Sequence, residues 1–153
     1  MTTRVQIQNR TYDFLHHDHG PQGFELVLFL PAPRSLSTLL RPPPREEVAR
    51  LTVGALNADE LLVQALGLGY ARMRLRVRHA HRERGLGRWL LSRAFQEAHA
   101  LDLGLAGELQ AQQLERARGF YARYGARVVP RALHPQHPWL VWDRAALLGQ
   151  TRR

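Results

Sequence analysis

The chain has 153 residues, of which 44% are hydrophobic and 23% charged, as in an ordinary globular domain that buries a sizeable core. It has no cysteine, which excludes disulfides, thiolate catalysis and cysteine-ligated metals. The formal charge is +9 without any lysine, and a field of this sign favours anionic ligands. No apolar run approaches the roughly 18 residues of a membrane helix, and no secretory segment opens the chain. We therefore expect one soluble, cytoplasmic domain over residues 1–153, with no membrane partner.

The first third of the chain is strand-like. We expect strands at Val5–Asn9, Tyr12–His16 and Phe24–Leu30, with a polar loop between the last two. That loop carries His16, His17, Asp18 and His19, which are metal-ligating residue types. Adjacent residues on an extended chain point in opposite directions, so the pattern favours a solvated turn and no metal site is predicted.

Proline and helix signals occupy the next segment. Ser35–Leu40 is typical of a short helix, and Arg41–Pro44 of a stiff connector. A second short helix is expected from Pro44 to about Leu51. Three runs then indicate an antiparallel meander, with a hairpin turn at residues 57–60. These runs are Leu51–Leu56, Leu61–Ala65 and Tyr70–Arg78.

The clearest functional signal follows the last of these strands. Apolar Met73, Leu75 and Val77 alternate with arginines, and residues 85–100 carry apolar positions at helical spacing. Arg82-x-x-Gly85-x-Gly87 lies between them as a strand-to-helix turn. Such a turn leaves free backbone N–H groups at the positive end of a helix dipole. It therefore predicts a site for a phosphate or pyrophosphate.

The C-terminal third continues the alternation of strands and helices. A strand is expected at Leu105–Ala111, and a helix at Gln113–Tyr124 with Gly125 as its stop. Two final strands are expected, at Ala126–Leu133 and Trp139–Arg144. The helix has Phe120, Tyr121 and Tyr124 on one side, so an aromatic face follows the glycine turn by 34–40 residues.

The order of elements and two motifs resemble the GNAT superfamily of acyl-CoA-dependent N-acetyltransferases. The acyl-CoA motif of that family, V-x-P-x-x-(Q/R)-x-x-G-x-(G/A), is matched at Val77, Arg82, Gly85 and Gly87, with His79 in place of proline. The second motif, A-x-x-(F/L)-Y-x-x-x-G-F, is matched at Ala117, Phe120, Tyr121 and Gly125. Ala126 replaces its phenylalanine, and Leu114 replaces an asparagine often found before the tyrosine.

This resemblance implies an α/β (α+β) fold with a central, mixed but mostly antiparallel sheet of about 6–7 strands flanked by helices. Residues 51–144 would form the core that carries the motifs, and residues 1–50 a divergent N-terminal part. The sheet would splay between Met73–Arg78 and Leu105–Ala111.

The resemblance also implies a chemistry, the transfer of an acetyl group from acetyl-CoA to a primary amine in a ternary complex. The pyrophosphate would lie on the loop amides, and the pantetheine along the strand before the loop. The implied cofactor-binding residues are Val77, Arg82, Arg84, Gly85, Leu86, Gly87 and Arg88. The N–H of Val77 would stabilise the oxyanion, and Tyr121 would protonate the leaving thiolate, with Tyr124 as the fallback.

Several alternatives stay open. Glu25, His79 and His81 are conceivable general bases, and none is assigned. The acceptor is a small-molecule or protein amine, although the charge also suits an amine associated with tRNA or another nucleic acid. From a different class, the chain could be a basic nucleic-acid-binding module with a degenerate acyl-CoA site. A homodimer is compatible with all of these readings.

Overall fold

A computed structural model describes residues 2–31, 45–54, 60–108, 122–123, 125–131 and 136–151 of the chain. The predicted helix at Ser35–Leu40 and the connector after it lie outside the described residues. So do most of the predicted helix at Gln113–Tyr124 and most of the turn predicted at residues 57–60. None of the helices described is long and apolar enough to cross a membrane.

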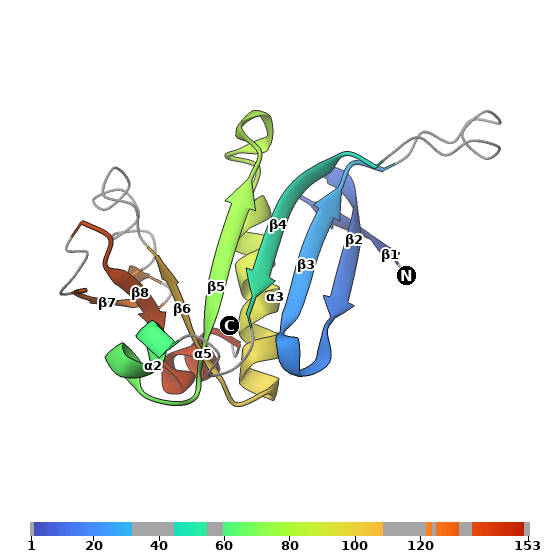
Figure 1. The fold of residues 1–153 in the computed structure, drawn as a ribbon. Coiled ribbons are helices and arrows are strands. Elements are labelled where there is room, and N and C mark those ends of the chain that lie inside the picture. The colour runs from blue at the N-terminus through green and yellow to red at the C-terminus, as the bar shows by residue number, and fades with distance from the viewer. Residues whose placement is uncertain are drawn as a thin grey trace, which may run out of the picture.

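One mixed sheet of eight strands forms the centre of the molecule, in the order β1-β2-β3-β4-β5-β6-β8-β7 (Figure 1). All neighbouring pairs are antiparallel except β5 and β6, which run parallel. The predicted fold class is therefore confirmed, with one strand more than expected. The strands are β1 (Thr2–Ile7), β2 (Arg10–Asp18), β3 (Phe24–Phe29), β4 (Glu47–Val53), β5 (Tyr70–Val77), β6 (Gly104–Glu108), β7 (Arg127–Val129) and β8 (Trp139–Trp142).

The core lies on one face of the sheet, beneath the long helix α3 (Leu86–Ala100) (Figure 1). Helical spacing gathers the apolar side chains of α3 into one stripe, which packs against β4 and β5. The stripe consists of Leu86, Leu90, Leu91, Ala94, Phe95 and Ala98, all buried. A C-terminal helix, α5 (Arg144–Thr151), adds Leu147 to the same core. The end of the chain was not expected to form a helix.

Two of the predicted middle elements are wrong. The short helix expected from Pro44 to Leu51 is instead strand β4, which pairs on both sides, with β3 and with β5. The strand expected at Leu61–Ala65 is instead helix α2 (Glu60–Leu66). Short apolar runs fit either state, and sheet pairing can outweigh a local helix signal.

The antiparallel meander expected from residue 51 to residue 78 is therefore wrong as well. Strands β4 and β5 are antiparallel neighbours, but α2 lies between them along the chain. Strand β5, helix α3 and the strands near Leu105, Ala126 and Trp139 are confirmed, most of the strands in shorter form. Gly125 has φ 81°, as expected of a glycine that ends a helix.

The parallel pair β5–β6 is short. Its register covers only Tyr70↔Gly104, Ala71↔Leu105 and Arg72↔Ala106, and beyond it the two strands diverge (Figure 1). At the paired end, a Cβ built on Gly104 would lie 2.5 Å from Cε1 of the Tyr70 ring and 3.1 Å from the carbonyl oxygen of Trp142. The Tyr70 hydroxyl donates to Asp143, which also accepts from Arg127 at 2.6 Å, so the ring is held in place.

We predict that Gly104→Ala destabilises the fold by about 1–3 kcal/mol, because the held Tyr70 ring leaves no room for a methyl group. Urea unfolding monitored by tryptophan fluorescence measures this free energy. Gly54→Ala is the matched control, because its Cβ would make only an ordinary contact, 3.7 Å from the Arg72 carbonyl oxygen. Equal losses of folding free energy in the two variants would contradict the close packing of Gly104 against Tyr70, at the paired end of β5 and β6.

Candidate functional site

The edge of β5 that faces β6 can be identified from its hydrogen bonds. Arg78 donates its N–H to Val48 (2.9 Å), and Arg72 accepts from Gly54 (2.8 Å), so the even-numbered residues pair with β4. On the other side, Gly69 accepts from Gly104 (2.8 Å). Because backbone groups alternate along a strand, the N–H and C=O of the odd-numbered residues point toward β6.

Leu75 and Val77 are odd-numbered residues that lie beyond the short pairing with β6. Their backbone groups therefore face the widening gap between the two strands (Figure 1). An extended molecule with amide groups of its own could pair with such an edge as an added strand does. Of the residues predicted from the sequence, Val77 is thus at the open edge, with its N–H directed into the gap.

The loop after β5 leads directly to the first turn of α3. It consists of a short 3-10 turn, His79–His81, and residues 82–85. Gly85 is the N-cap residue, with φ 76°, and no side chain caps the helix. The N–H of Trp89 donates to the C=O of Gly85 (3.0 Å), and the amides of Leu86 and Gly87 precede this bond at the helix start. The first turn carries no acidic residue, so these amides suit an anion.

The two glycines of the loop serve different purposes. Gly85 occupies the left-handed region, and a Cβ there would meet Nε2 of Gln8 at 2.8 Å. Gln8 lies in the two-residue turn between β1 and β2, so the tip of that hairpin rests on the loop. A Cβ on Gly87 would instead point at the sheet, 3.4 Å from Cδ2 of Leu75. That distance is an ordinary van der Waals contact, so the first turn of α3 lies against β5 without requiring a glycine at this position.

Three arginines surround the start of the helix. Nε of Arg82 lies 3.5 Å from the Val77 carbonyl oxygen, a distance at which the bond is weak. Nη1 of Arg84 donates to Nδ1 of His81 (2.9 Å), and Arg88 is exposed on the first turn of α3. Glu83, with φ 63°, is the acid of this loop, so the local charge is positive.

Comparison with solved structures identifies this arrangement, although no protein-family model and no curated protein matches the chain. The GNAT domain of S. lividans PAT superposes with a TM-score of 0.63 at 12% identity, covering 93% of this chain and 96% of that one. A cAMP-binding acyltransferase from Mycobacterium smegmatis gives 0.62 at 12%; this chain spans 55% of its length, with 99% of this chain covered. A spermidine N-acetyltransferase SpeG chimera from Vibrio cholerae and hSSAT gives 0.55 at 12%, covering 87% and 75%.

The chain has the GNAT fold. At these identities the likeness establishes the architecture, with the parallel pair that opens and the helix that begins beside it. In the N-terminal part, β1, β2 and β3 extend the sheet beside β4. The expectation that residues 1–50 form a divergent part stays a prediction. Within the GNAT fold, the structure brings together Val77, the loop glycines and the loop arginines. Tyr121 and Tyr124 lie outside the described residues.

The residues considered as general bases are differently placed. Nδ1 of His81 accepts from Arg84, so the neutral ring carries its proton on Nε2 and has no free lone pair. Glu25 accepts from His19 and from Arg50, on β3, two strands away from β5. These contacts, the His19 hydrogen bond first, hold the pKa of Glu25 below its ordinary value despite partial burial. Neither group is arranged to take a proton near the loop, and His79 is exposed.

A cluster that sequence reasoning missed lies where the GNAT fold opens. Glu108, at the end of β6, accepts from Arg72 of β5 and from Arg131 (2.9 Å). Both guanidinium groups stack on the buried ring of Trp139, at 5.2 and 4.4 Å from its centroid. Burial alone would raise the pKa of Glu108, but these arginines outweigh it and lower the pKa. The sequence feature that could have indicated this cluster is an acidic residue, Glu108, directly after an apolar run.

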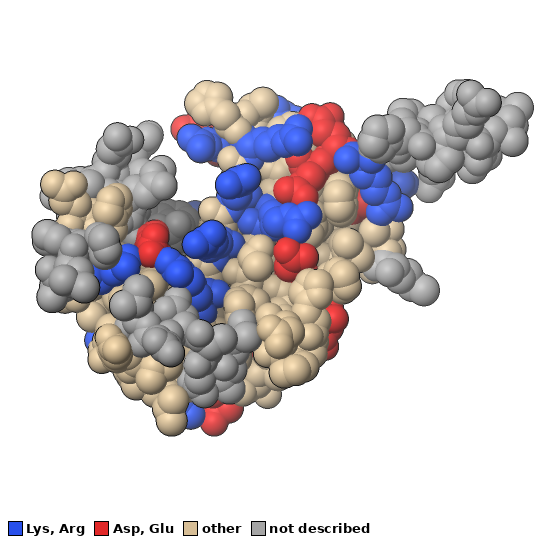
Figure 2. All heavy atoms as spheres, viewed as in Figure 1, with Lys and Arg blue, Asp and Glu red and all other residues tan. Residues whose placement is uncertain are grey.

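The face of the sheet opposite α3 is rich in arginine, and Figure 2 shows basic side chains in a band across it, with acidic ones beside them. Much of this charge is neutralised locally. Arg50 bonds to Glu25 (2.8 Å) and Glu47 (2.6 Å), and Arg72 is held by Glu108. The strong positive charge of the sequence is thus only partly available to a ligand on this face.

We predict that Gly85→Ala costs about 1–2 kcal/mol of folding free energy, because an L-residue is strained at this positive φ. Gly87→Ala should be neutral or stabilising by up to about 1 kcal/mol, because alanine favours the helix and its contact with Leu75 is tolerable. Thermal or urea unfolding of the two variants measures the difference. A larger cost at Gly87 than at Gly85 would refute this assignment of their roles.

Proposed function

We propose that the protein is an N-acetyltransferase that transfers an acetyl group from acetyl-CoA to a primary amine. The observation that carries the proposal is the juxtaposition of a free β5 edge with a positively charged helix start. The edge suits the amide-bearing pantetheine arm, and the loop amides suit the pyrophosphate of one elongated molecule. The GNAT fold of solved acetyltransferases supports the same reading.

The residues that would hold acetyl-CoA are those of the loop and the strand before it. The amides of Leu86 and Gly87 would donate to the pyrophosphate, and the guanidinium groups of Arg82, Arg84 and Arg88 would add charge-assisted contacts. The backbone groups of Leu75, which face the gap, would pair with the pantetheine amides. These contacts would together bind the coenzyme along its length, from the pyrophosphate to the pantetheine arm.

The transfer itself follows from direct attack. The neutral amine of the acceptor forms a bond to the thioester carbon, and the carbonyl oxygen takes up negative charge. The N–H of Val77, directed into the gap, is the donor we assign to this oxyanion. The C–S bond then breaks, and we assign the proton for the leaving thiolate to the phenol of Tyr121. The proton that the attacking nitrogen loses as it becomes the amide returns to this phenol through solvent.

A nucleic-acid-associated acceptor is the alternative that the charge of +9 suggests. The pairing of Arg50 and Arg72 with acids weakens this alternative, because paired guanidinium groups contribute less to phosphate binding. Among the described residues, Arg74 and Arg76 are exposed on the same face without an acid partner. RNA binding that is strong and salt-sensitive, with no effect of acetyl-CoA, would favour a basic binding module instead.

We predict that acetyl-CoA at a hundred times its dissociation constant stabilises the fold by about 2.7 kcal/mol, seen as a rise in Tm. Arg82→Glu should weaken binding at least tenfold, because it places a carboxylate beside the phosphates. Isothermal titration calorimetry gives both dissociation constants. Arg93→Glu is the matched control, since it makes the same charge change further along α3.

The outcomes of this titration are distinct. No thermal shift at millimolar acetyl-CoA would overturn the proposed function. Equal weakening by Arg82→Glu and Arg93→Glu would mean that net charge, and not the loop, governs binding.

We predict that Tyr121→Phe leaves acetyl-CoA binding intact and lowers kcat by about 10²-fold or more, because the thiolate would leave without its proton donor. Turnover is followed as release of free thiol, with primary amines drawn from polyamines, amino acids and peptides as acceptors. Tyr124→Phe is the comparison variant and should retain activity. Unchanged turnover in Tyr121→Phe, with loss in Tyr124→Phe, would transfer the acid role to the second tyrosine.

A further inference from the structure

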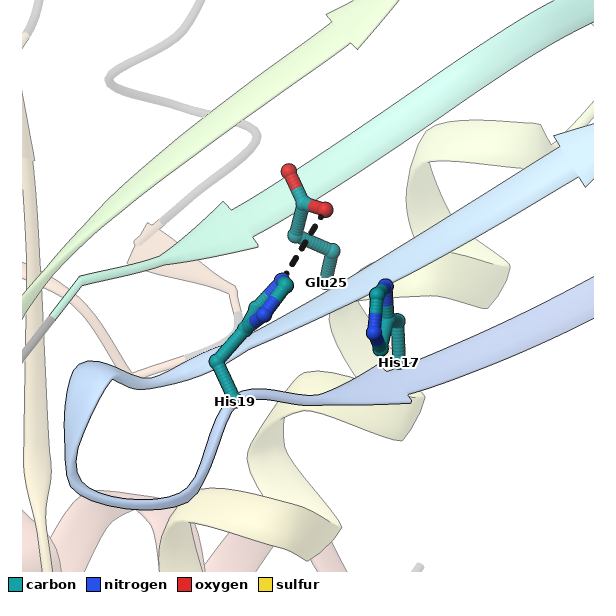
Figure 3. Close-up of side chains that lie close together, drawn as sticks. All are labelled: His17, His19 and Glu25. Atoms are coloured by element: carbon teal, nitrogen blue, oxygen red, sulfur yellow. Dashed lines mark hydrogen bonds and ion pairs between the residues drawn. The ribbon is translucent and has the colours of Figure 1, made fainter.

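Three metal-ligating side chains converge at the turn between β2 and β3, away from the acyl-CoA loop. His17, His19 and Glu25 each offer one ligand atom, and these atoms all lie within 4.8 Å of one another. Figure 3 shows the three side chains on the same side of the hairpin. The sequence analysis predicted a solvated turn here, because adjacent residues on a strand point in opposite directions.

Two features of the fold bring these side chains together. His17 and His19 are two residues apart, so they lie on the same face of an extended chain. Glu25 is the direct cross-strand partner of His17 in the β2–β3 ladder. Cross-strand partners bring their side chains close together, so the hairpin register supplies a third ligand that the sequence run alone did not contain.

From this geometry we propose that His17, His19 and Glu25 form a binding site for a divalent transition-metal ion of the zinc class. Nε2 of His19 lies 3.2 Å from Oε2 of Glu25, and the two histidine rings have their centroids 4.1 Å apart. Two donors on one zinc ion, with bonds of about 2.0–2.1 Å in tetrahedral geometry, lie about 3.3 Å apart. The ion would replace the proton that now lies between His19 and Glu25.

Arg50 prepares the carboxylate for this role. Its Nη1 donates to Oε1 of Glu25 (2.8 Å), which fixes the side chain and leaves Oε2 directed at His19. Arg50 is itself fixed by two bonds to Oε1 of Glu47 (3.0 and 2.6 Å). Outer contacts of this kind orient metal ligands and affect affinity by about 10–100-fold.

The donor set selects the class of ion. Two imidazoles and one carboxylate suit zinc, nickel and copper, whereas calcium and magnesium prefer oxygen alone. His17 and His19 are exposed, so an ion can enter from solvent. Three protein ligands leave at least one position for water or another ligand.

The site is independent of acetyl transfer. Glu25 lies on β3 and is separated from β5 by one strand, β4. Strands are about 4.8 Å apart, so the ion would be roughly 10 Å from β5 and could not contact a thioester at its far edge. We therefore assign the ion a structural role, stabilising the turn between β2 and β3. This role does not depend on whether the protein is an acetyltransferase.

The test is direct binding of Zn²⁺ to chelator-treated protein from which any purification tag has been removed. Calorimetry should find one ion per chain, and Co²⁺ should give visible absorption bands of a low-coordinate site. His19→Ala and Glu25→Gln should each weaken Zn²⁺ binding at least tenfold. His17→Ala should do the same, and each variant is checked for folding by circular dichroism in EDTA.

His16→Gln is the matched control, because it removes a neighbouring imidazole that lies on the opposite face, edge-on to Phe24. It should bind Zn²⁺ as the wild type does. Zn²⁺ binding that survives the His17→Ala/His19→Ala double change, or is lost equally in His16→Gln, would overturn the site. Absence of Zn²⁺, Ni²⁺ and Cu²⁺ binding by the wild type would overturn it as well.

Discussion

The candidate site depends on the shortness of one strand pairing. Strands β5 and β6 are hydrogen-bonded neighbours over three residue pairs and then separate, although β5 stays paired with β4 as far as Val77. A strand that keeps one partner and loses the other stays rigid while it presents free backbone groups. The packing of Tyr70 on Gly104, and the contacts of Glu108 with Arg72 and Arg131, fix the point at which the strands begin to separate.

The point where β5 and β6 separate and the turn at Gly85 are structurally connected. The first turn of α3 faces Leu75 at Gly87, and Gly85 turns the chain so that the helix begins directly after the open strand. The hairpin tip at Gln8 rests against the same glycine. The helix start is therefore positioned from two sides, by the strand that it follows and by the N-terminal hairpin.

The parts of this arrangement that are local in sequence could be predicted, and the parts that depend on distant partners could not. The alternation of Met73, Leu75 and Val77 and the glycine turn belong to one segment, and both were recovered. The first part of strand β4, up to Leu51, was mistaken for a helix because its pairing with β3 and β5 cannot be read from its own residues. The cluster around Glu108 could not be predicted for the same reason, since its arginines, Arg72 of β5 and Arg131, are distant from Glu108 in the sequence. The convergence of Glu25 with His19 likewise required the register of the hairpin.

The composition of the chain has a chemical consequence for the proposed acetyl transfer. All 22 strongly basic side chains are arginines, so no side chain in the protein carries a primary amine. The protein cannot acetylate its own side chains at lysine, and reversible lysine acylation cannot regulate it. Since cysteine is absent too, every free thiol that accumulates during turnover must come from the coenzyme. Under the proposed function, arginine would supply positive charge for an acyl donor without offering that donor a competing acceptor.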